Sequence, residues 1–399
     1  MGAALGPRFL LYQLARIFLI LGLQIQGVAV AWRMYALTGQ AMDLGWIGLV
    51  QFLPVMLLWP LTGTLSDRYD RRLITIFCLV VHLFVALMLA LAEPGPSGIF
   101  ALLALGATGR AFAAPAQQAL LPGLVTPDRF PRAVALNSTV FQLGSTIGPA
   151  LGGLLYAQVG PTTTFGITAT LMGAGIFTLA LLPPSVPVAG PPGETVWQRF
   201  AQGLTYVRTR PVLLGVISLD LFAVLLGGAV ALLPVFAKDI LHAGPEGLGL
   251  LRAAPAIGAT VSALWLAGHP MHRRAGSRLL FAVALFGFAT VVFGLSTELW
   301  LSMLALLVLG AADEISVVIR QTVVQVRTPD ALRGRVSAVN FLFISVSNEV
   351  GAFESGLTAA WWGPVTAVVV GGLGAMAVAG IYAWRFPELR KIDRLDLAD

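Results

Sequence analysis

The sequence is poor in the residues on which soluble proteins and metal sites depend. Only 11% of its 399 residues are charged, against about 25% in ordinary soluble proteins. Its single cysteine, Cys78, excludes an intramolecular disulfide and a thiolate metal cage. Four histidines without an H-E-x-x-H motif provide little for a metal or nucleophile–base centre. We therefore expect a protein that is not soluble and not an enzyme, with no catalytic residues and no metal.

An energy-supplying nucleotide site is missing as well. The sequence contains no G-x-x-x-x-G-K loop, which in ATP-driven proteins cradles the phosphates. We expect no cofactor, so any work that the protein does must draw on an ion gradient.

Hydrophobic residues, in contrast, make up 57% of the chain. A bilayer core of about 30 Å needs about 20 apolar residues per helix, and charged or Gly/Pro-rich breaks cut the chain into twelve such segments. The predicted spans are 9–37, 44–66, 71–92, 97–121, 131–158, 162–183, 211–237, 246–268, 277–297, 299–326, 334–361 and 364–386. The short alternating segments of a transmembrane β-barrel are absent. The sequence thus predicts an all-α, multi-pass membrane protein in a lipid bilayer.

The positions of Lys and Arg predict the orientation of the spans. Nearly all of those between spans fall on one side, and the other side holds only Lys238. Both termini are therefore predicted to be cytoplasmic. The net charge of +6 is explained by this bias, so no nucleic-acid partner is expected.

The longest break divides the spans six by six. The predicted parts are an N-terminal bundle (1–183), a linker (184–210), a C-terminal bundle (211–386) and a cytoplasmic tail (387–399). Apolar residues at helical spacing in 196–207 predict an amphipathic linker helix on the inner leaflet. The two halves also repeat: the tripeptide TPD at 126–128 recurs at 328–330. Paired six-helix halves place a binding site near the midplane between them.

The inner end of span 44–66 carries the run GTLSDRYDRR, residues 63–72. Its glycine permits close helix approach and its arginines anchor the turn at the inner surface. We take its candidate conformational-switch residues to be Gly63, Asp67, Arg68, Arg71 and Arg72. The run resembles the G-x-L-x-D-r-x-x-R-R signature of the major facilitator superfamily. That resemblance implies that Asp67 meets the positive N-terminus of span 334–361.

Span 131–158 contains GSTIGPALGG, residues 144–153. Small residues at four-residue spacing permit tight helix contact, and a proline kinks the helix. The switch candidates here are Gly144, Gly148, Pro149, Gly152 and Gly153. The run resembles the antiporter motif of the superfamily's exporters, while plain helix packing is the alternative.

Three further stretches extend the resemblance along the chain: QIQGVAVAWRMYALTG (24–39), LGWIGL (44–49) and RQTVVQVRTPDALRGRV (320–336). They are similar to the branch that contains enterobactin, macrolide and drug exporters. The resemblance implies a monomeric, proton-coupled antiporter of the bacterial inner membrane, which exports a small amphipathic molecule (siderophore, drug or metabolite) by alternating access. The alternative on the same fold is a proton symporter or facilitative importer of a small solute.

Ionisable residues inside a bilayer cost at least ~2.5 kcal/mol each and tend to mark transport paths. The candidates for proton coupling, in order as carriers, are Glu349, Asp313, Glu314 and Asp220, with Arg110 and Arg320 as cations. Asp313 and Arg320 are two turns apart on one helix face, where they could exchange partners. A fixed salt bridge or a helix-tethering hydrogen bond is the alternative for each.

Polar residues in the spans are the candidates for substrate contact. They are Gln24, Gln26, Gln51, Gln142, Arg110, Asn348 and Glu349. Arg110 could hold an anionic substrate group or form a structural ion pair. Arg16, Arg33 and Arg252 are expected to extend along their aliphatic stems to the membrane surface.

Overall fold

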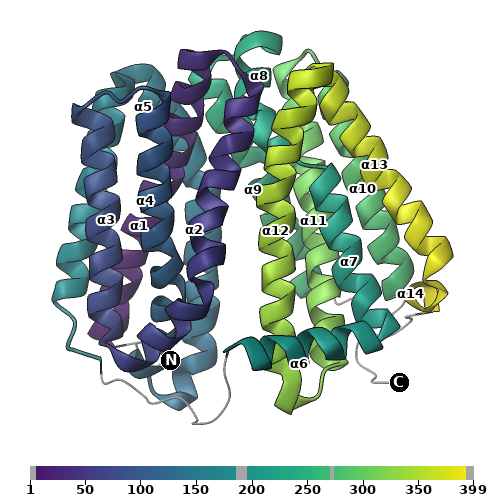
Figure 1. Ribbon diagram of the computed structural model, residues 1–399, viewed down its shortest axis with the longest axis horizontal. Coiled ribbons are helices and arrows are strands. Elements are labelled where there is room, and N and C mark those ends of the chain that lie inside the picture. Colours follow the sequence, from purple (N-terminus) through teal and green to yellow (C-terminus); the bar gives the residue numbers. More distant parts are fainter. Residues whose placement is uncertain (1–5, 186–195, 270–273, 392–399) are drawn as a thin grey trace. The chain divides into compact units, whose positions relative to one another are not determined.

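The computed structural model describes residues 6–185, 196–269 and 274–391, and it is built from helices joined by short turns (Figure 1). The side chains of 59–61, 63–68, 114, 118, 119, 196 and 391 lie outside this description. Within the described ranges, eleven helices are long and apolar enough to cross a membrane.

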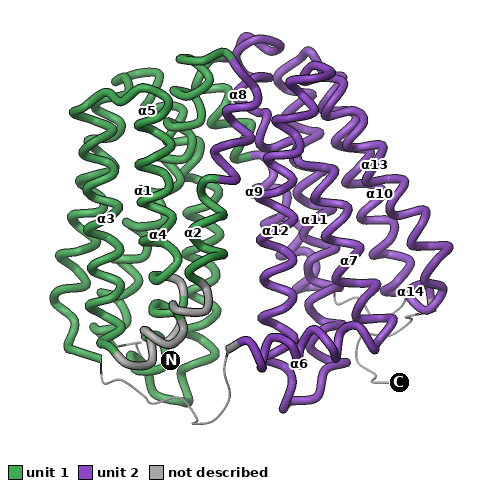
Figure 2. Tube along the Cα trace, in the orientation of Figure 1, with its two compact units in different colours: residues 1–39, 50–192, 244–253 green, residues 40–49, 193–243, 254–399 purple. Residues whose placement is uncertain are grey.

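The chain forms two compact units (Figure 2). The first comprises residues 1–39, 50–192 and 244–253, and the second comprises 40–49, 193–243 and 254–399. Two helices, α2 and α9, are therefore each divided between the units.

The first unit contains α1 (Pro7–Thr38), most of α2 (Ala41–Arg68), α3 (Arg71–Leu91), α4 (Pro96–Leu120) and α5 (Phe130–Ala180), with the turns η1 (Leu121–Leu124) and η2 (Pro127–Arg129) between α4 and α5. Its core is a cluster around Phe9, Tyr12, Leu79, Met172 and Leu179. These side chains come from α1, α3 and α5, so the unit is held together by helices that are distant in sequence.

Helix α5 is broken at Gly160. This residue has φ 77° and ψ 175°, which no helix contains, and which glycine adopts without a steric penalty. The two arms of α5 correspond to the predicted spans 131–158 and 162–183.

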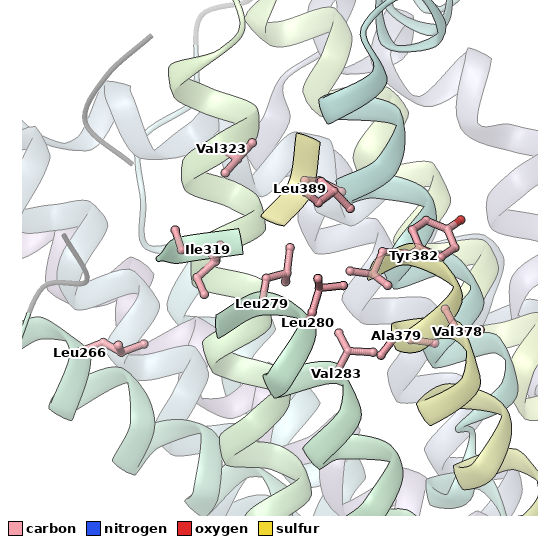
Figure 3. Packing of buried hydrophobic residues seen from close by; sticks show 14 residues of the cluster. Leu266, Leu279, Leu280, Val283, Ile319, Val323, Val378, Ala379, Tyr382 and Leu389 are labelled. Atoms are coloured by element: carbon pink, nitrogen blue, oxygen red, sulfur yellow. The ribbon is translucent and has the colours of Figure 1, made fainter. Parts of the chain in front are cut away.

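The second unit contains α6 (Val196–Thr209), α7 (Pro211–Leu226), η3 (Ala229–Leu232), α8 (Leu233–Val235), η4 (Phe236–Ile240), most of α9 (Gly244–Gly268), α10 (Ala275–Leu295), α11 (Leu299–Val326), α12 (Asp330–Trp362), α13 (Pro364–Arg385) and α14 (Pro387–Lys391). Figure 3 shows part of its core. Leu279 and Leu280 of α10 lie between Ile319 of α11 on one side and Ala379 and Tyr382 of α13 on the other.

The predicted span 211–237 is present as the candidate membrane span Pro211–Ile240, but the helix inside it is interrupted. Helix α7 ends at Leu226, and the chain continues as short turns after Gly227 and Gly228. A Cβ on Gly228 would lie 2.9 Å from the Gly351 carbonyl oxygen and 2.6 Å from Ser355 Oγ, both in α12. The glycine pair lowers helix propensity and also lets α12 approach the backbone closely.

A helix is present at the predicted amphipathic position, as α6. Its Val207 is buried in a cluster with Val336 and Val339 of α12, and Tyr206 donates a hydrogen bond to the Arg327 carbonyl oxygen (3.3 Å). Trp197, in contrast, is 61% exposed. The apolar face of α6 thus packs largely on α12 of the same unit.

The outward faces of the long helices are apolar. Phe77 of α3, Phe281 of α10 and Trp384 of α13 are 65%, 68% and 79% exposed. Exposed side chains of this kind on helices of membrane-spanning length are what lipid contact requires.

Candidate functional site

The second unit contains a buried ion pair between α7 and α11. Arg320 Nη1 pairs with Asp220 Oδ2, and both side chains are only 7% exposed. Arg320 Nε donates a second hydrogen bond to Ser316 Oγ, one turn earlier on α11 (3.1 Å). The two charges thus neutralise each other across α7 and α11, and Ser316 accepts a hydrogen bond from a further N–H of the guanidinium, as a buried ion pair requires.

Two further acids lie on α11 beside this pair. Asp313 interacts electrostatically with Arg320, Asp220 and Glu314, and Glu314 also interacts with Arg320. No hydrogen bond or ion pair joins Asp313 or Glu314 to another described residue. The structure therefore brings together Asp220, Asp313, Glu314 and Arg320, which we call the acid cluster, with more carboxylates than cations.

Glu349, the first-ranked carrier in the sequence, lies elsewhere. It belongs to α12, where a Cβ on Gly48 of α2 would lie 3.2 Å from its carbonyl oxygen and 3.3 Å from its Oε2. Nearby, the rings of Trp46 and Phe353 meet edge to face at 5.0 Å. Glu349 is thus part of the tight contact between the first turns of α2 and the second half of α12, and it is not part of the acid cluster.

Arg110 occupies the first unit, on α4. It interacts electrostatically with His82 of α3, whose Nδ1 is 2.8 Å from the Cys78 carbonyl oxygen. His82 is buried, and a Cβ on Gly106 would lie 4.0 Å from its Nε2, so His82 faces α4, the helix that carries Arg110.

The candidate substrate residues without charge are dispersed. Gln26 is buried on α1, and its Oε1 has no hydrogen-bond partner among the described residues. Gln51 and Gln142 are half-buried, whereas Asn348 is exposed and donates to the Ile344 carbonyl oxygen (2.9 Å). These four residues come from four different helices, α1, α2, α5 and α12.

The glycines of residues 144–153 face two different helices. Three of them lie against α1: a Cβ on Gly144 would be 2.5 Å from Ile20, one on Gly148 would be 2.5 Å from Gln24 Cβ, and one on Gly152 would be 3.0 Å from the Ile25 backbone. The small residues at four-residue spacing therefore place α5 directly on α1, as the sequence predicts for this motif.

The last glycine of the motif faces α9. A Cβ on Gly153 would lie 2.8 Å from the Gly249 Cα and would also meet the Pro245 carbonyl oxygen. Reciprocally, a Cβ on Gly249 would lie 2.8 Å from the Pro149 carbonyl oxygen, at the proline of the motif. The motif is thus a junction of α1, α5 and α9, and the α9 contribution was not predicted.

The corner between α2 and α3 is tied to the end of α5. Asp70 caps α3 by accepting from the Arg72 amide (2.9 Å), and it accepts from the Ser185 hydroxyl (2.6 Å) and amide (3.1 Å). The Arg71 amide donates to Ser185 Oγ (2.9 Å), and Arg72 Nη1 donates to the Leu182 carbonyl oxygen. Partial burial alone would raise the pKa of Asp70, but the hydrogen bonds from Ser185 and Arg72 outweigh it and hold this pKa below its usual value.

The sequence analysis did not identify Asp70 and Ser185 as functional candidates. An aspartate directly before a helix start is an N-cap signal, so Asp70 could have been found, whereas Ser185 is distant in sequence. The side chains of Gly63, Asp67 and Arg68 lie outside the described residues, and these candidates stay as predicted.

Comparison with known proteins agrees with this architecture. The family model for transmembrane secretion effectors, MFS_3, matches residues 7–399. The chain is 29% identical to the enterobactin exporter EntS of Citrobacter koseri over 96% of this chain and 93% of that protein. It is 28% identical to EntS of Shigella boydii over the same shares.

Solved structures show the same fold at low sequence identity. The nucleoside transporter NupG superposes with a TM-score of 0.75 at 13% identity, over 96% of this chain and 99% of that chain. An occupied, inward-facing bacterial homologue of the human lysosomal transporter Spinster gives 0.74 at 15% identity, over 98% and 99%. The family and these relatives are membrane transporters rather than enzymes, and a transporter of this kind acts on a small molecule. The chain is a multi-pass membrane protein that belongs to the transmembrane secretion effector family of the major facilitator superfamily.

Proposed function

We propose that the protein is a proton-coupled antiporter that exports a small amphipathic molecule across the bacterial inner membrane by alternating access. The curated relatives that support export are described as enterobactin exporters, which makes a siderophore-like molecule one candidate substrate. In this proposal the chain has twelve spans, with the two arms of α5 counted separately and both termini in the cytoplasm, and it works as a monomer without a cofactor.

The acid cluster is the observation that carries the proton coupling. One arginine faces three carboxylates, and its ion pair is with Asp220. A carboxylate that lacks a close partner in a membrane interior favours its protonated form, whereas access to water or an arginine favours ionisation. Asp313 therefore replaces Glu349 as the proposed proton carrier.

The cluster also suggests how a proton could move helices. With Asp313 protonated, Arg320 remains paired with Asp220 of α7. When Asp313 loses its proton, it competes for Arg320, which lies two turns away on the same face of α11. Each proton taken up or released thus changes the strength of the α7–α11 link, which is the coupling that an antiporter needs.

The test uses inside-out vesicles that are acidified by respiration and followed with a pH-sensitive dye. A panel of siderophores, macrolides, cationic dyes and amino-acid-like metabolites is added, and we expect one class to cause alkalinisation of the lumen. Asp313→Asn should reduce that response at least tenfold, whereas Gln325→Ala, at an exposed position of the same helix, should preserve it. Substrate movement that is unaffected by collapse of the proton gradient would instead favour facilitated transport.

A further inference from the structure

Arg252 lies on α9 in the part that belongs to the first unit. It is about 12 Å along the helix axis from Gly244, which places it well inside a span. A Cβ on Gly27 of α1 would lie 3.5 Å from its Nη1. The guanidinium is therefore directed at α1. The sequence analysis expected it to extend to the membrane surface instead.

The position of Arg252 is fixed by the helix junction next to it. Gly249, one turn earlier on α9, packs on the Pro149 and Ala150 carbonyl oxygens of α5, where its Cβ would lie at 2.8 and 3.2 Å. Residues three apart on a helix share a face, so Arg252 is held on the face of α9 that meets α1 and α5.

Among the described residues, this guanidinium has no counter-charge. Its Nε is buried and has no hydrogen-bond partner among the described residues, and no ion pair joins it to a described acid. Glu246, the other charged residue of this part of α9, is exposed in the first turn. Two other membrane arginines differ, because Arg320 pairs with Asp220 and Arg33 Nη1 donates to the Leu89 carbonyl oxygen (3.3 Å).

Arg252 is half-buried, and its buried Nε has no partner among the described residues. A cation in this state is costly in a membrane, and an anionic ligand would remove that cost. We propose that Arg252 binds the carboxylate of the transported molecule between α9 and α1. A guanidinium presents two parallel N–H groups that match a planar carboxylate. This assignment of a substrate class rests on the proposed transport function.

The surroundings favour a single carboxylate over a lipid phosphate. Binding of a phosphate typically uses several cations or a helix N-terminus, whereas Arg252 alone, among the described residues, has an atom within 4 Å of a Cβ on Gly27. Gln24 lies one turn before Gly27 on α1, on the same face, and its Cβ packs beside Gly148. In this proposal, the Gln24 amide hydrogen-bonds a polar group of the ligand next to the carboxylate.

The test measures binding without transport. The full chain is placed in phosphatidylcholine nanodiscs and its melting temperature is followed with benzoate as the probe and benzamide as the uncharged control. A ligand at ten times its Kd stabilises by RT ln(1 + [L]/Kd), so we expect benzoate to raise the melting temperature by about 2 °C and benzamide to have no effect. Arg252→Gln should lose the benzoate response, and Arg252→Lys should retain part of it.

A second pair of variants leaves Arg252 in place. Gly27→Asp puts a carboxylate beside the guanidinium and should abolish the benzoate response, whereas Gly27→Asn, of the same size but uncharged, should preserve it. Arg33→Gln removes an arginine that already has a partner, so the response should also be preserved there.

Several results would overturn the proposal: no response of the wild-type protein, an equal response to benzamide, or an equal response in Arg252→Gln. If phosphatidylglycerol nanodiscs stabilise the wild type but not Arg252→Gln and remove the benzoate response, the site holds a lipid phosphate and the substrate assignment is wrong. If the wild-type protein binds benzoate but shows no proton-driven export, the proposed function is contradicted while the proposed binding of a carboxylate by Arg252 is supported.

Discussion

At the scale of single residues, the pair of Asp220 and Arg320 can be separated from the proton carrier by its effect on stability. Removing one partner leaves a buried, uncompensated charge, which costs about 3–5 kcal/mol. We expect Asp220→Asn and Arg320→Gln each to lower the unfolding free energy by about that amount. The double variant should be less destabilised than the sum of the two.

This prediction is checked by chemical denaturation of the purified protein. Gln325→Ala serves as the control because that residue is exposed on α11. Additive losses in the double variant would mean that the two side chains do not stabilise each other in the membrane.

Asp70 gives a dependence of stability on pH. Its pKa in the folded protein lies below the usual value because of hydrogen bonds from Ser185 and Arg72. The stabilisation is therefore complete above the unfolded pKa of about 3.9 and is lost as the pH falls through the lower folded pKa.

Asp70→Asn keeps a capping side chain but removes the charge. We expect this variant to melt at a lower temperature than the wild type at pH 7, with the difference shrinking as the pH falls below about 4. The measurement is a series of melting curves in detergent. A difference that is constant across this range would show that the carboxylate charge has no part in the stabilisation.

At the scale of helices, the junction of α1, α5 and α9 predicts that two similar substitutions in α5 have opposite effects. Gly→Ala in a helix gains up to about 1 kcal/mol of propensity. Gly173 has no atom within 4 Å of an added Cβ, whereas Gly153 faces the α9 backbone. We expect Gly173→Ala to raise the melting temperature slightly, and Gly153→Ala to lower it and to reduce transport at least tenfold.

The same two variants test whether the glycines of residues 144–153 are needed for transport or only for helix packing. If Gly153→Ala is as stable and as active as Gly173→Ala, the close approach of α5 and α9 is not needed at any step of the cycle.

The helices themselves could be predicted well, because hydropathy over about 20 residues is a local property of the chain. Thus α3 (Arg71–Leu91) and α11 (Leu299–Val326) match the predicted 71–92 and 299–326 closely. The end of α7 at Leu226 was missed, because the composition stays apolar up to residue 237 and the reason for the break is the approach of α12.

The site could be predicted only in part, since its partners are distant in sequence. The sequence identified Asp220 and Arg320 as candidates, but it could relate Arg320 only to Asp313 on the same helix. The pairing with Asp220 and the contact of Gly153 with Gly249 depend on how helices pack. A single sequence carries no direct signal for such contacts.

At the scale of the whole molecule, α2 connects the two units because residues 40–49 belong to the second unit and the rest of the helix to the first. Its first turns pack on α12, where a Cβ on Gly48 would lie 3.0 Å from Ala352 Cβ. In the proposed alternating access, this contact between α2 and α12 must open once in each cycle. Its opening connects the binding site to the side of the membrane at which α2 begins and α12 ends.

A disulfide can test whether it opens. The chain has one cysteine, buried Cys78, so Cys78→Ala gives a clean background for Gly48→Cys with Ala352→Cys. A disulfide needs Cβ atoms about 3.5–4.5 Å apart, which a shift of several tenths of an ångström provides here. Oxidation should abolish proton-coupled transport in vesicles, and reduction should restore it.

The single variants Gly48→Cys and Ala352→Cys, treated in the same way, should remain active. The extent of cross-linking is read from the change in gel mobility after proteolytic cleavage between α2 and α12. If the fully cross-linked protein transports as fast as the reduced one, the contact of α2 with α12 stays closed during transport. The substrate would then have to leave by a path that does not separate these two helices, and rocking of the predicted bundles 1–183 and 211–386 against each other could not be the mechanism.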